Sequence, residues 1–415
     1  MKYLTATFSL FLLIINSIFA DTIPERRRDQ FPKEDAYLVV PLPYSYPGIG
    51  EGLFLLGNAS NVFDTTADLL FIEVVGDATG RVAVFQEVPI ITDELFLSIE
   101  FQDINRAVVN NYAIRGMNGS NGDDYTLLDI TKADTSLLRL DYTLQNRRIN
   151  LYISQSQGEF ALDAIRDPDG NLITQLSEPY TDSSKTNQIG FSLDYTDDYL
   201  DPRKGFRFGF DYIDQPAKDT VNDPDYYILN YNFLFFQPIS KADTLVINYF
   251  QSDAHVRSKG NTDPNYYRSE LNFNCGTDPI CLQSEQELVD SFVNAATHGS
   301  ATDLGGLERL RSYPQNRFQG GHSGFLGAEY RWNLTEEATP FNYFFWKDVR
   351  TGKQVAFFAE AGSVSEESSD LWKEKRYTYG VGFRILAASG SVYRADIAAG
   401  DEGTEVAVFF YYPWR

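Results

Sequence analysis

One stretch of the chain says most about its fold: DLGGLERLRSYPQNRFQGGHSGFLGAEYRW, residues 303–332. In its last third every second residue is apolar: Leu326, Ala328, Tyr330 and Trp332. Because successive side chains of a strand point to opposite faces, this pattern predicts a strand with one apolar and one polar face. The triplet Arg311–Tyr313 precedes that strand. A buried arginine needs a carboxylate partner, and Glu329 on the polar face can supply one.

The same two-residue period continues through most of the chain. Apolar residues alternate with polar residues or glycine at 95–101, 138–144, 189–195, 206–212, 227–235, 245–249, 355–361 and 377–385. A soluble β-sandwich also alternates, but here the pattern continues without a domain boundary. At about 25 residues per strand and connection, the chain supplies about sixteen strands. We predict an all-β fold in which residues 51–415 form a transmembrane antiparallel barrel with a polar interior.

Three motifs carry a resemblance to a known family. The Arg311–Tyr313 triplet lies ahead of the alternating strand, VAFFAEAGSV at 355–364 contains Glu360, and DYLDPRKG at 198–205 has the form of a tight turn. Together they resemble the bacterial surface antigen superfamily, the BamA/TamA-type barrels of outer-membrane assembly. The resemblance implies a barrel of sixteen strands whose extracellular loop folds into the lumen. There the arginine of the loop would meet acidic residues of the wall.

The resemblance predicts a lock that holds this loop in the lumen, made of Arg311, Ser312, Tyr313, Glu329 and Glu360. Alternation places both glutamates on the lumen side of successive strands, within reach of one guanidinium group. Ser312 stands where the family has glycine, and Arg309 is a second arginine that could make the ion pair instead. The lock could serve only as a brace or also as part of an active gate, and the sequence leaves both open.

The C-terminal segment EVAVFFYYPW, Glu405–Trp414, is predicted to be the last strand. In the family the first and last strands form a weak seam that is proposed to open towards the lipid. We expect Tyr412, Pro413 and Trp414 to lie at this seam, where Pro413 lacks the amide donor that would complete a ladder. A strand that simply ends at Pro413 is the alternative interpretation.

The N-terminus has the pattern of a secretory signal: Lys2, an apolar run at 4–15 and a cleavage site after Ala20. Residues 1–20 are therefore expected to be a signal peptide rather than an anchor helix, which needs about 20 apolar residues. Residues 21–50 show little periodicity and are predicted to be an extended leader. This leader is too short for the POTRA domains that precede the barrel in many family members.

The longest irregular segment, residues 253–303, is predicted to be an extracellular loop. It contains Cys275 and Cys281, which in an exported chain are expected to form a small disulfide loop. It also contains a predicted short helix at Ser284–Ala296. Loops of this length are commonly functional.

Composition argues against several classes of function. The chain has 58 acidic and 35 basic residues, a net charge of -23, so no basic stripe is available for nucleic acid. It has three histidines, and no Gly-x-Ser-x-Gly motif surrounds the pair His322–Ser323. We predict no enzymatic activity, and the sequence implies no cofactor, nucleotide or metal.

The resemblance implies that the chain assists the insertion or translocation of polypeptides, or of lipids, at the bacterial outer membrane. The expected partners are outer-membrane lipids and unfolded or secreted polypeptide clients. A periplasmic or barrel partner, or a second copy of the chain, is a further expectation. Two other functions stay open. One is a passive channel, which would need neither an opening seam nor a lock. The other is a surface adhesin or receptor that acts through residues 253–303.

Overall fold

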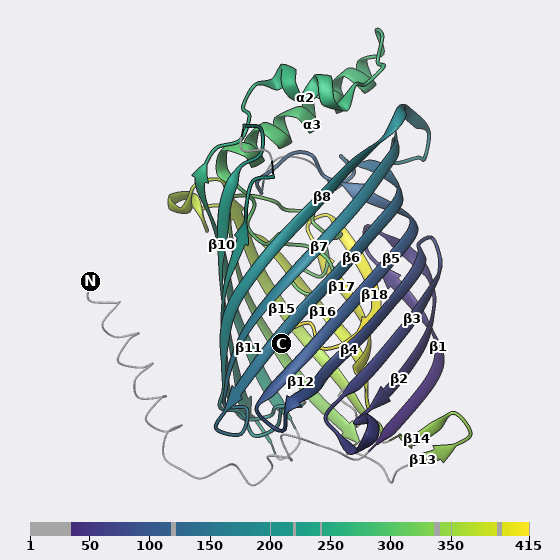
Figure 1. Cartoon of the computed structure of the whole chain (residues 1–415), viewed down its shortest axis with the longest axis vertical. Coiled ribbons are helices and arrows are strands. Elements are labelled where there is room, and N and C mark those ends of the chain that lie inside the picture. Colours follow the sequence, from purple (N-terminus) through teal and green to yellow (C-terminus); the bar gives the residue numbers. More distant parts are fainter. Residues whose placement is uncertain are drawn as a thin grey trace.

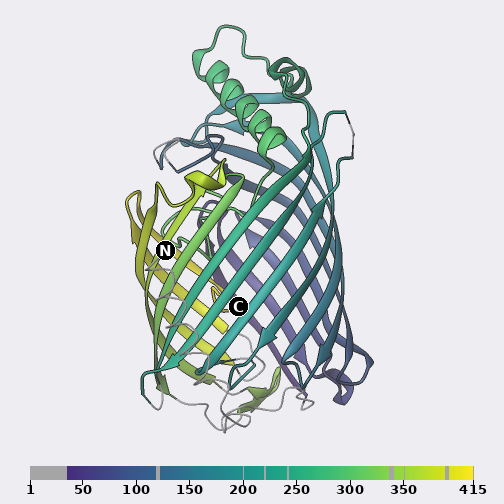
Figure 2. The ribbon, with the colours of Figure 1, turned by 90° about the vertical axis from the view of Figure 1, so that its left-hand side faces the viewer.

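The computed structural model describes residues 35–117, 122–199, 201–218, 221–240, 243–335, 341–349, 351–387 and 392–414. The expected signal peptide, residues 1–20, and the first part of the expected leader lie outside the described residues. The described strands form one closed antiparallel barrel (Figures 1 and 2).

Sixteen strands of the described residues form the barrel wall. They are β1 (Ala36–Tyr46), β2 (Gly50–Ser60), β3 (Asp68–Gly76), β4 (Thr79–Ile91), β5 (Leu95–Asn111), β6 (Thr126–Leu144), β7 (Ile149–Arg166), β8 (Leu172–Asp194), β9 (Gly205–Gln215), β10 (Asp225–Pro238), β11 (Thr244–Ser258), β12 (His322–Thr335), β15 (Thr351–Ser365), β16 (Arg376–Ala387), β17 (Val392–Gly400) and β18 (Gly403–Phe410). Neighbours in the chain pair antiparallel, β12 pairs directly with β15, and β18 returns to β1. The predicted sixteen-stranded barrel is confirmed, and a two-sheet sandwich is excluded because the sheet closes on itself.

The remaining elements lie at the two ends of the barrel. They are the hairpin strands β13 (Phe341–Tyr343) and β14 (Trp346–Val349), the helices α2 (Pro264–Leu271) and α3 (Pro279–His298), and the 3-10 turns η1 (Val62–Asp64) and η2 (Ser368–Asp370). In Figure 1 the helices lie at the upper end and the hairpin at the lower end, beside β1. None of the described helices combines the length and the apolar character that crossing a membrane requires.

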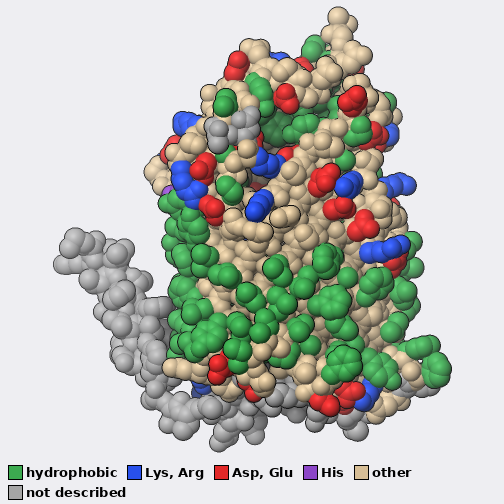
Figure 3. Space-filling model, in the orientation of Figure 1, with side chains coloured by type: hydrophobic (Ala, Val, Ile, Leu, Met, Phe, Trp, Pro, Cys, Tyr) green, Lys and Arg blue, Asp and Glu red, His purple; other side chains and the backbone are tan. Residues whose placement is uncertain are grey.

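The outer face of the wall is apolar because every second side chain points outward. On β12, Leu326 and Trp332 are exposed, 48% and 47%, whereas Glu329 and Arg331 on the other face are buried. Figure 3 shows hydrophobic side chains gathered in a band across the lower half of this face, with charged side chains above and below it. Such a band is the surface that a transmembrane barrel presents to lipid.

Strands near the start of the barrel depart from the alternation. In β2 the run Leu53–Leu56 is exposed at its odd-numbered residues and buried at its even-numbered ones, although all four are apolar. Inside the barrel Phe54 lies opposite Val74 of β3, and Leu56 lies opposite Ile72. The prediction of a polar interior is therefore wrong for this part of the wall. Continuous apolar runs are the sequence signal of strands that are apolar on both faces.

The barrel also begins earlier than predicted. β1 occupies Ala36–Tyr46, inside the segment 21–50 that the sequence analysis assigns to an extended leader. That assignment is wrong over these residues. Pro41 and Pro43 suggest irregular structure, but an edge strand tolerates proline wherever no ladder hydrogen bond is lost.

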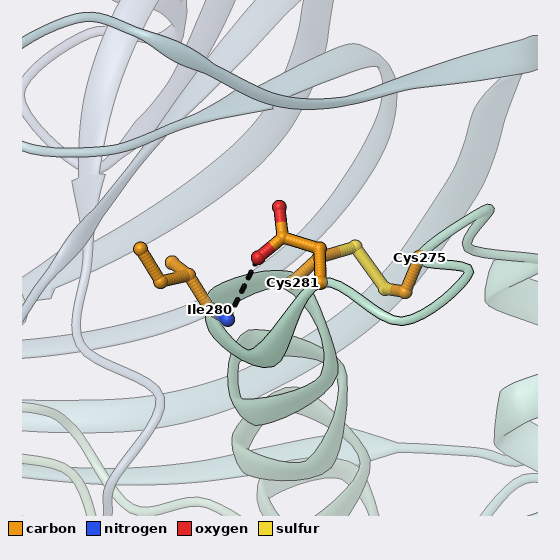
Figure 4. Close-up of a disulfide and its surroundings, with 4 residues drawn as sticks. Cys275, Ile280 and Cys281 are labelled. Atoms are coloured by element: carbon orange, nitrogen blue, oxygen red, sulfur yellow. Dashed lines mark hydrogen bonds between the residues drawn. A yellow bond between two sulfur atoms is a disulfide. The ribbon is translucent and has the colours of Figure 1, made fainter.

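The helical segment at the upper end is tied by a disulfide between Cys275 and Cys281 (Figure 4). The predicted helix lies inside α3, which begins earlier than expected. Asp278 explains the earlier start, because its side chain accepts a 3.0 Å hydrogen bond from the N–H of Ile280. The disulfide thus fixes the first turn of α3 to the connection from α2.

Candidate functional site

After α3 the chain turns back into the barrel as a lumen loop, residues 304–319. The backbone groups of Leu304 and Phe318 join the two ends of the loop by two hydrogen bonds of 3.0 Å. Gly305 has φ +109°, and a Cβ there would lie 2.2 Å from the carbonyl oxygen of Pro314. Glycine at this position is what allows the loop to fold so tightly.

Arg311 of the lumen loop lies against three acidic residues of the wall. Its backbone N–H and Nε donate to the Glu360 carboxylate at 2.9 and 2.7 Å. Nη1 donates to Asp396 at 2.9 Å, and Nη2 to Glu329 at 3.3 Å. None of these four side chains is exposed to solvent. The guanidinium also lies 3.4 Å from the centre of the Phe358 ring. The structure thus brings Arg311, Glu329 and Glu360 together and adds Asp396.

The second arginine of the loop takes no part in this cluster. Arg309 lies 3.7 Å from the centre of the Phe250 ring and pairs with the exposed side chain of Glu308 at 3.1 Å. Of the two candidate arginines, Arg311 is therefore the one that meets the acidic residues. The sequence analysis missed Asp396, although alternation within VYRADIAAG of β17 places it on the lumen face.

Further arginines of the wall surround the same carboxylates. Arg384 donates to both Glu329 oxygens, at 2.7 and 2.5 Å, and Arg331 Nε donates to one of them at 2.8 Å. Asp396 is also paired with an arginine of its own strand, Arg394. Glu360 differs, because among the described residues Arg311 alone donates hydrogen bonds to it. Arg311 is therefore the residue that neutralises Glu360.

The other two residues of the predicted lock contact the wall beside Arg311. Ser312 Oγ lies 2.6 Å from Thr378 Oγ1. A Cβ on Gly400 would lie 2.3 Å from Ser312 Oγ, so a glycine in the wall makes room for the Ser312 hydroxyl. The Tyr313 hydroxyl accepts a 3.3 Å hydrogen bond from the N–H of Asp401. The whole triplet is buried.

The lumen loop contacts both edges at which the barrel closes. On the β1 side, the Gln315 N–H donates to the Pro47 carbonyl at 2.9 Å, and the Tyr46 hydroxyl donates to the Gln315 side chain at 2.9 Å. On the β18 side, Arg317 donates to Glu402 at 2.8 and 2.7 Å. The loop therefore joins β1 and the β1–β2 turn to the β17–β18 turn from inside the barrel.

The seam between β1 and β18 is nearly unpaired. One residue pair joins the two strands in the described part of the chain, Ser45 with Val408, and Ser45 Oγ donates to the Val406 carbonyl at 2.9 Å. On its other edge β18 shares eight residue pairs with β17. The ladder that holds the rest of the wall is therefore almost missing here.

Two prolines explain why β1 pairs so little. The carbonyl oxygens of Val39 and Pro43 accept hydrogen bonds across the seam, from the side chains of Trp346 and Tyr393. The N–H and C=O of one strand residue point to the same side, so odd-numbered residues of β1 turn these groups towards the seam. Pro41 and Pro43 therefore remove two donors from this edge.

Three residues expected at the seam are buried inside the barrel instead: Tyr412, Pro413 and Trp414. β18 ends at Phe410, and Tyr411 has φ 67°, which turns the chain into the lumen. There the Arg331 guanidinium lies 4.0 Å from the centre of the Tyr412 ring, and the Trp414 indole donates to the Glu308 carbonyl at 2.8 Å. The predicted extension of the last strand to Trp414 is wrong, because these aromatic side chains find partners in the lumen.

His322 and Ser323 point to opposite faces of β12. His322 Nδ1 lies 2.8 Å from a carboxylate oxygen of Asp253, whereas Ser323 Oγ donates to the Thr302 carbonyl at 2.6 Å. A serine nucleophile and its base must lie within hydrogen-bonding reach of each other, so these two residues do not form such a pair. The described residues contain no cluster of three or more metal-ligating side chains.

Neither protein-family models nor curated protein sequences give a match to this chain. Among solved structures, BamA from Haemophilus ducreyi lacking POTRA domains 1-3 is similar, with a TM-score of 0.49 and 9% identity. The match covers 92% of this chain and 70% of that one. CdiB from Escherichia coli is similar with a TM-score of 0.45 and 10% identity, over 92% of this chain and 63% of that one.

Proposed function

We propose that this chain is an outer-membrane barrel of the BamA/TamA type that assists the insertion or translocation of polypeptides at its seam. The seam carries the proposal, because among the described residues a single pair, Ser45 with Val408, joins its two strands. Inside a bilayer no water is present to satisfy unpaired backbone groups, so an open strand edge is costly. A barrel that keeps such an edge offers a place where another extended strand can pair.

The lumen loop is proposed to control this edge. Gln315 holds the β1 side, Arg317 holds the β18 side, and Arg311 fixes the loop to the wall. While all three contacts are made, the two edges cannot move apart without breaking either the Gln315 hydrogen bonds or a buried ion pair. The loop therefore braces the closed seam, and release of one contact is the step that opens it.

The proposed place of action is the bacterial outer membrane, a location that the apolar band in Figure 3 supports. The proposed partners are outer-membrane lipids and unfolded or secreted polypeptides. A periplasmic partner, a second barrel or a second copy of the chain would deliver these clients. Of the expected loop 253–303, residues 253–258 belong to β11. Residues 259–303, which contain α2, α3 and the disulfide, would then lie on the cell surface.

Movement of lipid is a second candidate, and one observation favours it. The inner wall beside the seam is apolar at Phe54, Leu56 and Val74, which are 6%, 5% and 7% exposed. An acyl chain that entered through the seam would meet apolar side chains there rather than charges. A passive channel has less support, because the lumen loop and the C-terminal tail fill part of the lumen.

A disulfide across the seam tests the proposal. The variant Ser45→Cys with Val408→Cys would join β1 to β18, because directly opposite side chains have Cβ atoms about 5 Å apart. The matched control, Ala395→Cys with Val408→Cys, would join β18 to β17 within the wall. Both would be expressed in cells depleted of the native chain, and the barrel proteins of the outer membrane would be quantified.

The seam disulfide is expected to lower the amount of barrel proteins, and a reductant should restore it. The control should behave as the native chain under both conditions. Normal barrel-protein content with a fully oxidised seam would refute opening at β1 and β18. Unchanged proteins together with a shift of lipids between the leaflets would favour the second candidate.

A further inference from the structure

The lower part of β1 is left without its expected partner. If β18 continued in the register of the pair Ser45–Val408, the tail residues 411–414 would stand opposite residues 39–42 of β1. The tail turns into the lumen at Tyr411 instead. β18 therefore leaves the seam edge of β1 uncovered below its own end.

The hairpin β13–β14 lies at this vacant edge, although it comes from the connection between β12 and β15. Tyr37 pairs with Lys347, and Leu38 pairs with Trp346. The Trp346 indole also donates to the Val39 carbonyl at 2.9 Å. Figure 1 shows the hairpin projecting beside the lower end of β1. A segment far away in the sequence thus pairs with β1 directly below the stretch that the last strand leaves.

β14 pairs with the part of the β1 edge that still has backbone N–H donors. Pro41 and Pro43 supply no N–H, so below them Tyr37 and Val39 are the odd-numbered residues of β1 whose N–H groups face the seam. β14 lies directly on this stretch. Any incoming strand that pairs with the lower half of β1 needs the same donors, so it must compete with β14.

We propose that the hairpin β13–β14 is a resident competitor strand, which covers the donor-bearing edge of β1 and must leave before another strand can pair there. Its consequence for client insertion rests on the proposed function. The position of the hairpin does not depend on that function, because it rests on residue pairs within this chain. The proposal adds a built-in regulator to the seam.

The contacts of the hairpin suit a strand that can leave. In the part of the chain that the structure describes, β14 makes two residue pairs with β1, whereas β1 and β2 share pairs along the whole of β1. The tip residues Phe344 and Phe345 are 80% and 57% exposed. Figure 3 shows hydrophobic side chains continuing from the band to this corner of the molecule. Aromatic residues favour the membrane interface, which would keep a released hairpin close to the seam.

A cysteine pair tests the geometry. Even-numbered residues of β1 turn their polar groups towards β2, so Leu38 and Trp346 form a non-hydrogen-bonded pair with Cα atoms about 4.5 Å apart. That separation suits a disulfide. In the purified barrel, Leu38→Cys with Trp346→Cys should crosslink on mild oxidation. Leu38→Cys with Phe344→Cys, which uses the unpaired tip, should not. Equal crosslinking of both variants, or none in the first, would overturn the proposal.

A peptide tests the competition. The probe is a synthetic peptide with the sequence of residues 341–349, carrying a photo-crosslinker. Its capture on β1 is expected to be about tenfold greater with the Leu38→Cys, Trp346→Cys variant reduced than with it oxidised, because a resident strand lowers the fraction of free edge. Equal capture in both states would contradict the proposal. The same protein sample supplies both states, so a folding defect cannot explain a difference.

Both readouts use the purified barrel and no client. They therefore separate this proposal from the proposed function. If the hairpin crosslinks and blocks the peptide while the seam disulfide has no effect in cells, the function is wrong and the competitor strand remains. If the seam disulfide acts in cells and the hairpin neither crosslinks nor blocks the peptide, the competitor strand is wrong and the proposed function remains.

Discussion

Replacing Arg311 with alanine is expected to release the lumen loop. The side chain makes three hydrogen bonds to three buried carboxylates. After its removal Glu329 keeps Arg384, whereas Glu360 keeps no guanidinium partner among the described residues. Removing one partner of a buried ion pair typically costs about 3–5 kcal/mol, mainly because a charge is left uncompensated. The loss should therefore be concentrated at Glu360.

The cost falls on the state in which the loop is docked. A difference of about 4 kcal/mol corresponds to about a thousandfold change in an equilibrium constant. The population of undocked loop should rise by that factor, provided that undocked Glu360 is solvated by the lumen.

A buried reporter in the loop can measure this population. Ser312 is 2% exposed, so Ser312→Cys should react with a thiol reagent only when the loop undocks. The two native cysteines are joined in a disulfide and do not compete for the reagent. In the Arg311→Ala background, the labelling rate should rise by about two to three orders of magnitude over the same reporter with Arg311 present.

Arg309→Ala provides the matched control, because Arg309 lies in the same loop but pairs with the exposed Glu308. Its labelling rate should change by less than about thirtyfold, since the pair with Glu308 contributes about 0–1 kcal/mol and the contact with the Phe250 ring about 1 kcal/mol. Adding Glu360→Gln to Arg311→Ala should recover part of the loss by removing the orphaned charge. An unchanged rate in Arg311→Ala would refute the lock and assign loop docking to apolar packing.

Three further outcomes are expected. Replacing Pro43, which stands opposite the end of β18, with valine restores one donor at the seam, so hydrogen exchange of β18 amides should slow while β6 and β7 are unaffected. Reducing the Cys275–Cys281 disulfide should cost the helical segment about 2 kcal/mol and increase protease cleavage there without unfolding the barrel. Burial raises the pKa of Asp303 to about 7, so this carboxyl destabilises the fold increasingly as pH rises from about 4 to 7. Asp303→Asn should therefore raise the unfolding temperature at about pH 8 and leave it unchanged at about pH 4.

Alternation in the sequence was sufficient to predict the barrel, because lipid outside and a polar lumen inside impose a period of two on each strand. It failed where that contrast is absent. The run Leu53–Leu56 is apolar on both faces, so the sequence of β2 shows no alternation of polar and apolar residues there. β1 was overlooked for a related reason. Pro41 and Pro43 normally interrupt a sheet, and they are tolerated here because the edge they border is not paired.

The site was predictable only where contacts follow from neighbouring strands. Glu329 and Glu360 lie on paired strands, so their proximity follows from register. Asp396 comes from a strand further around the barrel, and its contact with Arg311 depends on how deeply the loop enters. The inward position of the C-terminal tail depends on its contacts with Arg331 and with the Glu308 carbonyl of the lumen loop. The sequence of the tail itself contains no pattern that predicts these contacts.

The inward tail also bears on the order in which the chain folds. Tyr412 donates a 2.8 Å hydrogen bond to Asp201, between β8 and β9, and its ring lies beside Arg331 of β12. Trp414 bonds to the lumen loop. The surfaces that receive the tail therefore belong to distant parts of the chain, and they exist together only once most of the wall has formed. Burial of the tail is thus a late event that reports a completed barrel, and a misregistered wall would leave its aromatic residues exposed.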